Sequence, residues 1–490
     1  MSNLAVLPII IPLLAGILLA FFHNNLRISR FLSKLFIIMN VIVVVYVTYI
    51  VFQEGSLILE TGSWVAPYGI VFVADYFSII LVLTTNLLSV ACLFIAPKLV
   101  SDTKEKFYYY TFIFLLISGV SGAFLTGDLF NLFVFFEVLL MASYGLIVLG
   151  GDKVQLRESL KYVLINLFSS VIFVTTVAFL YAVVGTVNMA HIAERVQEVE
   201  QQGVLTTIAI VLFFVFGTKA ALFPLYYWMP KSYVVPNPVT SALFGALLTK
   251  VGIYSIIRIF TLIFVEVEFT RNFFIVVAAL SMIFGVIGAL STNDVKLLIA
   301  YNVIPSIGFI LLGLAVFNET ALAGSVYYLV HDMIIKTALF LLAGVITYAA
   351  GTSDLRKMGG LIHHYPVLGW ILFISAFVLA GIPPFSGFIG KLLLLKGSFE
   401  GEQIVIVIIA LLTSLLILYS VMKIFIHGFW GEKNEQLERK STSGLLGPIS
   451  FLLIFSIFIG VGAEFVYPYI DTIATYLLDP ELYIHSVLKE

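Results

Sequence analysis

The sequence predicts an all-α integral membrane protein of about fourteen transmembrane helices. Hydrophobic residues make up 61% of the 490 positions and charged residues only 11%, a balance that does not fit a water-exposed surface. Apolar runs of about 20 residues, the length that crosses ~30 Å of hydrocarbon, recur along the whole chain. They begin near Leu4, Leu35, Asp75, Phe107, Asp128, Leu160, Val204, Val239, Asn272, Val295, Ala321, Pro366, Gln403 and Gly444.

The connections between these runs are short, so residues 1–490 are expected to form a single polytopic membrane domain. LLTKVGIYSIIRIF resembles LLTSLLILYSVMKIF later in the chain, and each segment follows a run interrupted by proline. Because an odd number of runs separates them, two inverted five-helix repeats are predicted. The expected parts are N-terminal helices (1–106), a first repeat (107–262), a second repeat (272–430) and a C-terminal helix and tail (444–490).

Lysine and arginine are concentrated in one set of alternate loops, and such loops stay on the cytoplasmic side of a membrane. That set holds 16 basic residues, which are Arg27, Arg30, Lys34, Lys98, Lys104, Lys106, Lys153, Arg157, Lys161, Lys231, Lys296, Arg356, Lys357, Lys433, Arg439 and Lys440. The other set holds four, which are Arg195, Arg258, Arg271 and Lys489. Both termini are therefore expected to be extracytoplasmic.

The remaining six lysines lie in or near the apolar runs, where a charge at the bilayer centre costs at least ~2.5 to 3.5 kcal/mol. Lys396 and Lys423 lie near predicted helix ends, from which a lysine can reach the interface. Five charged residues lie deep in their runs: Glu137, Lys219, Lys250, Lys336 and Lys391. Such residues usually mark an ion or proton path. The alternative is a set of static ion pairs that only fix helix packing.

The eleventh run carries His331, Asp332 and Lys336 at its centre. Asp332 and Lys336 are four residues apart on one helical face and are expected to pair. His331 and Lys336 point about 140° apart on an ideal helix, so they share one path only if water or a local bulge intervenes. His331 is therefore either a hydrogen-bonded core residue or a proton relay, a role that suits histidine because it titrates near neutral pH.

Proline and glycine interrupt two runs in corresponding halves of the chain. The residues concerned are Gly217, Pro224 and Pro230 in the first run and Gly381, Pro383, Pro384 and Gly387 in the second. Paired broken helices near the midplane indicate a transport site, and each break has a lysine nearby, Lys219 or Lys391. Water is expected to reach both lysines, because lipid cannot satisfy the carbonyls that proline frees. Simple proline kinks are the alternative, but they do not explain the lysines.

Several of these segments resemble one family. TKAALFPLYYWMPKSYVVPNPVTSALFGALLTKVGIYSIIR, HDMIIKTALFLLAG, LAGIPPFSGFIGK and DLFNLFVFFEVLLMASYGLIVLG resemble the antiporter-like membrane subunits shared by respiratory complex I and the multisubunit Mrp sodium/proton antiporters. The matches extend from about Gly119 to Lys391. Tyr226, Tyr233 and Lys231 stand where complex I subunits usually have histidine or an acidic residue, which favours the Mrp branch.

The resemblance implies a residue for each step of a proton path. By this resemblance, Glu137 and Lys219 form a coupled pair and Lys250 is the central relay. The path then continues through His331 and Lys336 and ends at Lys391. His331 stands five positions before Lys336, rather than the four more usual in the family. The implied protein is a secondary transporter subunit of the cell membrane that exchanges protons for sodium within a complex of several membrane subunits.

Two other interpretations stay open. One is a proton-pumping subunit of a complex I type NADH:quinone oxidoreductase, and the other is a structural scaffold. The chain has no nucleotide, haem or iron–sulfur motif, so no cofactor and no enzyme activity of its own are expected. No metal site is expected either, and Cys92, the only cysteine, cannot form an intramolecular disulfide. The net charge of -2 gives no indication of nucleic-acid binding.

Overall fold

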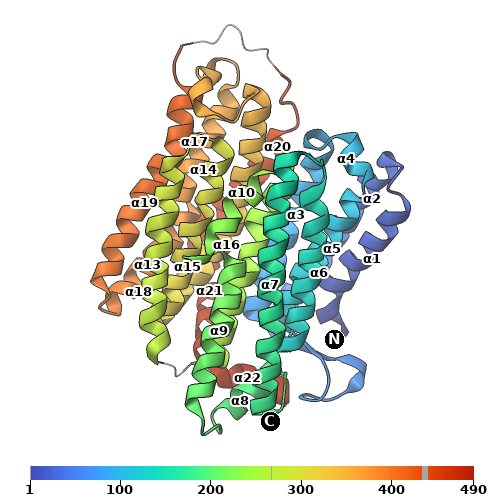
Figure 1. Ribbon diagram of the computed structural model, residues 1–490, viewed down its shortest axis with the longest axis vertical. Coiled ribbons are helices and arrows are strands. Elements are labelled where there is room, and N and C mark those ends of the chain that lie inside the picture. The colour runs from blue at the N-terminus through green and yellow to red at the C-terminus, as the bar shows by residue number, and fades with distance from the viewer. Residues whose placement is uncertain (1, 266–267, 433–439, 490) are drawn as a thin grey trace.

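The computed structural model describes residues 2–265, 268–432 and 440–489, and these form an elongated bundle of helices (Figure 1). The α-helices are α1 (Leu7–Phe21), α2 (Leu26–Glu54), α3 (Tyr76–Leu99), α4 (Asp102–Lys106), α5 (Tyr109–Leu125), α6 (Leu129–Val148), α7 (Lys153–Val184), α8 (Met189–Val196), α9 (Gln202–Ala220), α10 (Met229–Val234), α11 (Pro238–Leu243), α12 (Thr249–Leu262), α13 (Glu268–Ser291), α14 (Val295–Tyr301), α15 (Val303–Val316), α16 (Glu319–Ala350), α17 (Pro366–Ala380), α18 (Ser386–Glu400), α19 (Ile404–Ile424), α20 (Leu446–Val461), α21 (Ala463–Leu478) and α22 (Pro480–Leu488).

Short turns connect several of these helices. The 3-10 turns are η1 (Ser2–Val6), η2 (Thr61–Ser63), η3 (Leu225–Trp228), η5 (Leu355–Lys357) and η6 (Leu361–His363), and the π-helical turns are η4 (Phe244–Leu248) and η7 (Phe425–Phe429). Two strands, β1 (Leu57–Glu60) and β2 (Val71–Ala74), pair in antiparallel register between α2 and α3. This hairpin was not predicted, because strands of four residues are too short to stand out among apolar runs of membrane-crossing length.

The predicted class, a multi-pass helical membrane protein, is confirmed. Within the described residues, 11 helices are long and apolar enough to cross a membrane, or 12 when the bent pair α20 and α21 counts as one span. The shorter apolar helices α5 and α17 fall below that length. The predicted number of fourteen is reached only if both are also counted as spans, so that number stays a prediction.

Burial separates central from peripheral helices. The span from α11 through η4 to α12 is fully buried, and α16 is largely buried, whereas α2 and α19 bury only about a third of their most apolar windows. A charged side chain on α12 or α16 therefore lies inside the protein and away from lipid. This position allows ion chemistry that a lipid-facing helix could not accommodate.

Two helices are broken as predicted. α9 ends at Ala220, where Ala221 adopts a left-handed conformation, and the chain continues through η3 into α10. α17 ends at Ala380, where Gly381 has a φ of 83°, and the chain restarts as α18 at Ser386. Both breaks follow from proline, which removes a backbone donor and prevents the helix from continuing.

A repeated motif supports the predicted relation between the two halves. The pattern Thr-x-Asp/Asn with the last residue as an N-cap occurs at four places: Thr126–Asp128, Thr186–Asn188, Thr292–Asp294 and Thr352–Asp354. In each, the threonine hydroxyl accepts a hydrogen bond from the backbone N–H two residues later, at 3.1 to 3.3 Å. The Asp or Asn then caps the next helix by accepting backbone N–H groups.

These segments pair into two clips, defined here as the Asp128–Asn188 and Asp294–Asp354 bridges. Leu129 and Met189 donate backbone hydrogen bonds across the first clip, and Val295 and Leu355 do so across the second. The first clip starts α8 at one end of the bundle and the second starts α14 toward the other end (Figure 1). An inverted repeat requires this arrangement, while the boundaries 107–262 and 272–430 stay a prediction.

One basic residue does not lie where the charge count placed it. Arg258 was assigned to an extracytoplasmic loop, but it lies inside α12 and is 4% exposed. The prediction was wrong because Asp75, the N-cap of α3, pairs with Arg258 and makes its burial tolerable. Lys433 and Arg439 lie outside the described residues.

Candidate functional site

A buried cluster of three charges occupies the middle of the bundle. Asp332 on α16 lies 2.7 Å from the ammonium of Lys250 on α12 and 3.5 Å from that of Lys336, one turn along its own helix. All three side chains are buried. We call these residues the central cluster. Two ammonium groups share one carboxylate, so the cluster carries one excess positive charge when both lysines are protonated.

The backbone around the central cluster supplies further acceptors. Lys250 donates to the carbonyl of Gly245 at 2.8 Å, and Lys336 donates to the carbonyl of Asn302 at 2.8 Å. Gly245 belongs to the π-helical turn η4, in which the i→i−4 hydrogen-bond pattern is interrupted. Asn302 lies at the junction of α14 and α15, where its carbonyl is also accessible. Irregular backbone therefore supplies each ammonium group with an acceptor in addition to Asp332.

The Glu137–Lys219 region differs from the central cluster. Lys219, near the end of α9, donates to the hydroxyl of Ser170 at 3.1 Å, and its ammonium lies 4.9 Å from the ring centre of Phe136. Glu137 on α6 does not lie within 4.0 Å of Lys219, and its Oε1 has no hydrogen-bond partner among the described residues. The predicted pair is therefore open in this structure.

His331 faces away from Lys336, as helical geometry predicts for residues five apart. Its Nδ1 shares a hydrogen bond of 2.8 Å with the hydroxyl of Ser386, the first residue of α18, and Ser386 contacts Ser456 of α20 at 2.6 Å. The other ring nitrogen, Nε2, is buried and has no partner in the described part of the chain. His331 thus joins the second break rather than the central cluster.

Lys391 reaches the second break from α18. Its ammonium donates to the carbonyls of Ala380 at 2.8 Å and Leu379 at 3.3 Å, at the end of α17. The ring centres of Phe309 and Tyr328 lie 4.9 and 5.8 Å from the same ammonium. At the first break the carbonyl of Thr218 accepts the indole N–H of Trp228 at 3.1 Å. Protein groups thus satisfy these carbonyls, and water at either lysine stays a prediction.

A glycine allows another helix to contact each break. A Cβ atom added to Gly252 of α12 would lie 2.6 Å from the backbone nitrogen of Ala220, and one added to Gly460 of α20 would lie 2.4 Å from that of Ser386. Gly252 is two residues from Lys250. The same close contact therefore fixes the central helix against the end of α9 that bears Lys219.

The predicted residues thus fall into three groups. Lys250 and Lys336 meet in the central cluster, Glu137 and Lys219 form an open pair beside it, and His331 and Lys391 line the second break. Sequence reasoning paired Asp332 with Lys336 but missed its closer contact with Lys250, because that contact joins residues 82 positions apart. No sequence signal in a single chain identifies such a partner.

Comparison with known proteins gives a consistent result. Residues 126–417 match the family described as NADH:quinone oxidoreductase/Mrp antiporter, TM. A protein of Bacillus subtilis (strain 168), named as the D component of a Na(+)/H(+) antiporter, is 50% identical and the match covers 100% of both chains. A chain in the structure of the Mrp complex from Dietzia sp. DQ12-45-1b superposes with a TM-score of 0.94 at 29% identity, covering 99% of both chains. A chain of respiratory complex I from Thermus thermophilus shares the fold, with a TM-score of 0.84 at 23% identity over 98% of this chain and 100% of that one.

Proposed function

The chain belongs to the NADH:quinone oxidoreductase/Mrp antiporter transmembrane family, and we propose that it is the D-type component of a multisubunit Na⁺/H⁺ antiporter in the cell membrane. Its own part is to carry protons along Glu137, Lys219, Lys250, His331, Lys336 and Lys391. The observation that carries this proposal is the sharing of Asp332 by Lys250 and Lys336 between α12 and α16, at positions buried inside the bundle. The partners are the other membrane subunits of the complex, consistent with the multisubunit complexes that contain similar chains.

The central cluster is the proton store of this mechanism. With both lysines protonated the cluster carries a single excess charge, and with one lysine neutral it carries none. Either lysine can keep the ion pair with Asp332 while the other gives up its proton. At an effective dielectric constant of ~20, two unit charges ~4 Å apart interact by ~4 kcal/mol, so a charge that moves nearby changes how tightly the cluster holds its proton.

Lys219 is the charge that moves. In the open arrangement it donates to Ser170, while Glu137 has an unused carboxylate oxygen. Formation of the Glu137–Lys219 ion pair would neutralise the charge of Lys219 and reduce its repulsion of Lys250. Opening of the pair restores that repulsion and drives the excess proton through Lys336 toward His331 and Lys391.

The direction of transport depends on orientation. The distribution of basic residues supports extracytoplasmic termini and a cytoplasmic loop at Arg27–Lys34. Single cysteines in a Cys92→Ala variant can be tested with a membrane-impermeant thiol reagent on intact cells. We expect a cysteine at Leu482 to be labelled from outside and one at Arg27 to be protected. Labelling confined to the Arg27 position would reverse the orientation.

Lys250→Met tests the proposed function. Asp332 keeps Lys336 as its partner in this variant, so the cluster stays neutral and assembly should persist. We expect sodium-dependent proton movement in vesicles, normalised to assembled complex, to be lost. The matched control is Lys396→Met, because Lys396 is an exposed lysine that pairs only with Glu400 on the same helix among the described residues. Normal antiport in an assembled Lys250→Met complex would contradict the relay and favour the scaffold interpretation.

A redox-driven proton pump is the second candidate, because the same fold occurs in respiratory complex I. Purification of the native complex from the membrane separates the two. Co-purifying quinone- or flavin-binding subunits would favour the pump, and a complex of membrane subunits alone favours the antiporter.

A further inference from the structure

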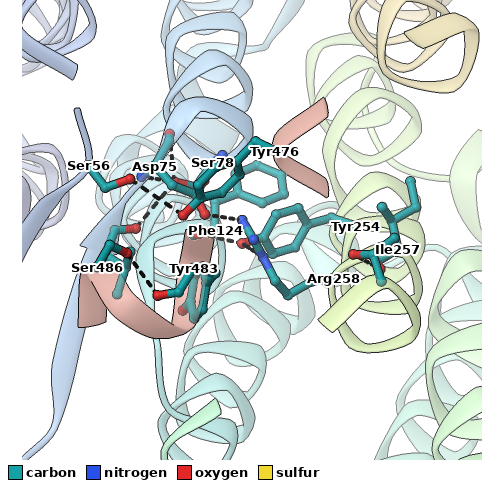
Figure 2. A network of polar contacts seen from close by, with 12 residues as sticks. Ser56, Asp75, Ser78, Phe124, Tyr254, Ile257, Arg258, Tyr476, Tyr483 and Ser486 are labelled. Carbon is teal, nitrogen blue, oxygen red and sulfur yellow. Dashed lines mark hydrogen bonds and ion pairs between the residues drawn. The ribbon is translucent and has the colours of Figure 1, made fainter. Parts of the chain in front are cut away.

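A second buried ion pair lies apart from the proton path. Arg258 of α12 pairs with Asp75, the N-cap of α3, and Figure 2 shows the guanidinium pointing at the carboxylate. Asp75 is fully buried and Arg258 is 4% exposed. The other carboxylate oxygen of Asp75 accepts the backbone N–H of Ser78 at 2.7 Å. Both oxygens of Asp75 are therefore occupied, and the pair is fixed in place.

Aromatic rings enclose the guanidinium. The carbon at its centre lies 5.0 Å from the ring centre of Tyr483 and 5.6 Å from those of Phe77 and Tyr254. The hydroxyl of Tyr254 donates to the carbonyl of Phe124 at 2.7 Å and so cannot turn away from this position. Four separate segments, α3, α5, α12 and α22, thus hold one arginine.

Arg258 lies about two turns from Lys250 on α12. Lys250, Tyr254 and Arg258 follow at four-residue intervals on α12, which places Arg258 about 12 Å from Lys250 along the helix axis. The face of the bundle that carries α8, α22 and both chain ends is called the terminal face (Figure 1). α12 reaches it, since Arg258 lies against Tyr483 of α22. Polar side chains therefore extend from the central cluster to the terminal face.

A cavity lies close to the pair. It has a volume of about 490 Å³, and its lining includes Ser56, Tyr76, Tyr476 and Ser486. Figure 2 shows Ser56 and Ser486 on the side of Asp75 away from Arg258. Tyr76 directly follows Asp75 in the chain, so the cavity reaches the immediate neighbourhood of the pair.

Arginine at this position cannot pass a proton on. The guanidinium has donors but no acceptor and keeps its charge at any physiological pH. Because Asp75 neutralises the guanidinium, the pair stops proton transfer by its lack of an acceptor and not by net charge. We propose that Arg258, held by Asp75, is a seal at the terminal-face end of α12, so that Lys250 cannot exchange protons directly with that face. This inference rests on the proposed role of Lys250.

The test is the double variant Asp75→Asn with Arg258→Met. Asparagine caps a helix as well as aspartate does, and replacing both charges leaves neither of them unpaired. We expect vesicles with the assembled variant to show passive proton conductance, without a sodium gradient, several-fold above that of the native complex. Conductance equal to the native value would overturn the seal and leave the pair a structural contact.

Adding Lys250→Met to the double variant identifies the route of the leak. If protons pass through Lys250, conductance should return to the native value, whereas a leak that persists comes from disrupted packing and contradicts the proposal. Antiport is measured separately with Lys250→Met alone. Failure of the relay and failure of the seal therefore give different results.

A labelling experiment tests the seal with the native ion pair in place. Ser255 is buried between Lys250 and Arg258, and Thr472 is exposed at the cavity. In a Cys92→Ala background, a cysteine at Thr472 should react with a small cationic thiol reagent added at the terminal face, and one at Ser255 should not. Reaction at Ser255 would show an open passage and overturn the proposal even if the charge variants fail to assemble.

Discussion

The central cluster and the Glu137–Lys219 region differ in how their charges are paired. In the central cluster every ammonium has a carboxylate and a backbone carbonyl within reach. In the Glu137–Lys219 region the ammonium contacts a serine hydroxyl and the Phe136 ring, and it forms no ion pair with Glu137 in the described part of the chain. The charges of the central cluster are in contact, whereas those of Glu137 and Lys219 are apart. The first therefore suits storage of a proton and the second suits a switch.

The largest effect is expected from Asp332→Ala, which removes the carboxylate of the central cluster. Two buried ammonium groups would then lack their counter-charge, and a broken buried pair costs ~3 to 5 kcal/mol. We expect the protein to be depleted from the membrane, measured as assembled complex per cell. Adding Lys250→Met and Lys336→Met should restore assembly without antiport. Normal assembly of Asp332→Ala alone would mean that the cluster does not hold the fold.

Glu137→Ala and Lys219→Ala are expected to act on transport alone. Because no ion pair is closed there, removing one residue breaks no contact between the two, and the complex should still assemble. Antiport in vesicles should be lost in each single variant and in the double variant. Recovery of assembly only in the double variant would instead identify a structural pair, and normal antiport in the double variant would exclude the switch.

Gly252→Ala and Gly460→Ala test whether both breaks need their close backbone contacts. The added Cβ atoms would lie 2.6 and 2.4 Å from backbone nitrogens, so a destabilisation of ~1 to 3 kcal/mol is expected. The measurement is the thermal unfolding midpoint of the purified complex. Gly447→Ala on α20 is the matched control, since nothing among the described residues lies within 4 Å of its added Cβ. Equal midpoints for Gly460→Ala and Gly447→Ala would contradict the predicted contact.

The smallest effect is expected from a substitution in the first clip, measured as a change in unfolding midpoint. The acidic residues of the two clips differ in pKa. Burial raises the pKa of Asp128 to about 6, whereas hydrogen bonds from Arg356 lower the pKa of Asp354 to about 2. Charged Asp128 therefore destabilises the folded state, and this penalty appears as pH rises from about 4 through 6. Asp128→Asn keeps the cap but removes the penalty, so its gain in unfolding midpoint over the native protein should be larger at pH 7.5 than at pH 5. A gain independent of pH would contradict the assignment.

The sequence predicts much of the fold because its signals are local. Twenty-residue apolar runs, the prolines at Pro224 and Pro384 and lysines in the middle of apolar segments are all visible without knowledge of contacts. The Thr-x-Asp/Asn segments of the clips are visible in the sequence. The same pattern also occurs inside α3 and α13, at Thr84–Asn86 and Thr270–Asn272, so it identifies the clips only once the helix boundaries are known.

The sequence does not reveal which charged residues on different helices pair with one another. Asp332 has an obvious partner one turn away, which conceals the closer Lys250. Arg258 looks like a loop residue near the end of an apolar run, and only the distant Asp75 explains its burial. In both cases the deciding contact joins segments that pack together only after the spans have formed, and no local propensity encodes it.

The short distances within the central cluster have a consequence for the membrane potential. Lys250 and Lys336 lie 2.7 and 3.5 Å from the same carboxylate, so a proton exchanged between them travels less than about 10 Å. Moving one charge across the full ~30 Å of hydrocarbon at 100 mV involves ~2.3 kcal/mol of electrical work. The exchange within the cluster therefore involves under ~1 kcal/mol of that work, whatever its direction. In the proposed relay, voltage therefore acts mainly on the steps that bring protons to the cluster and take them away.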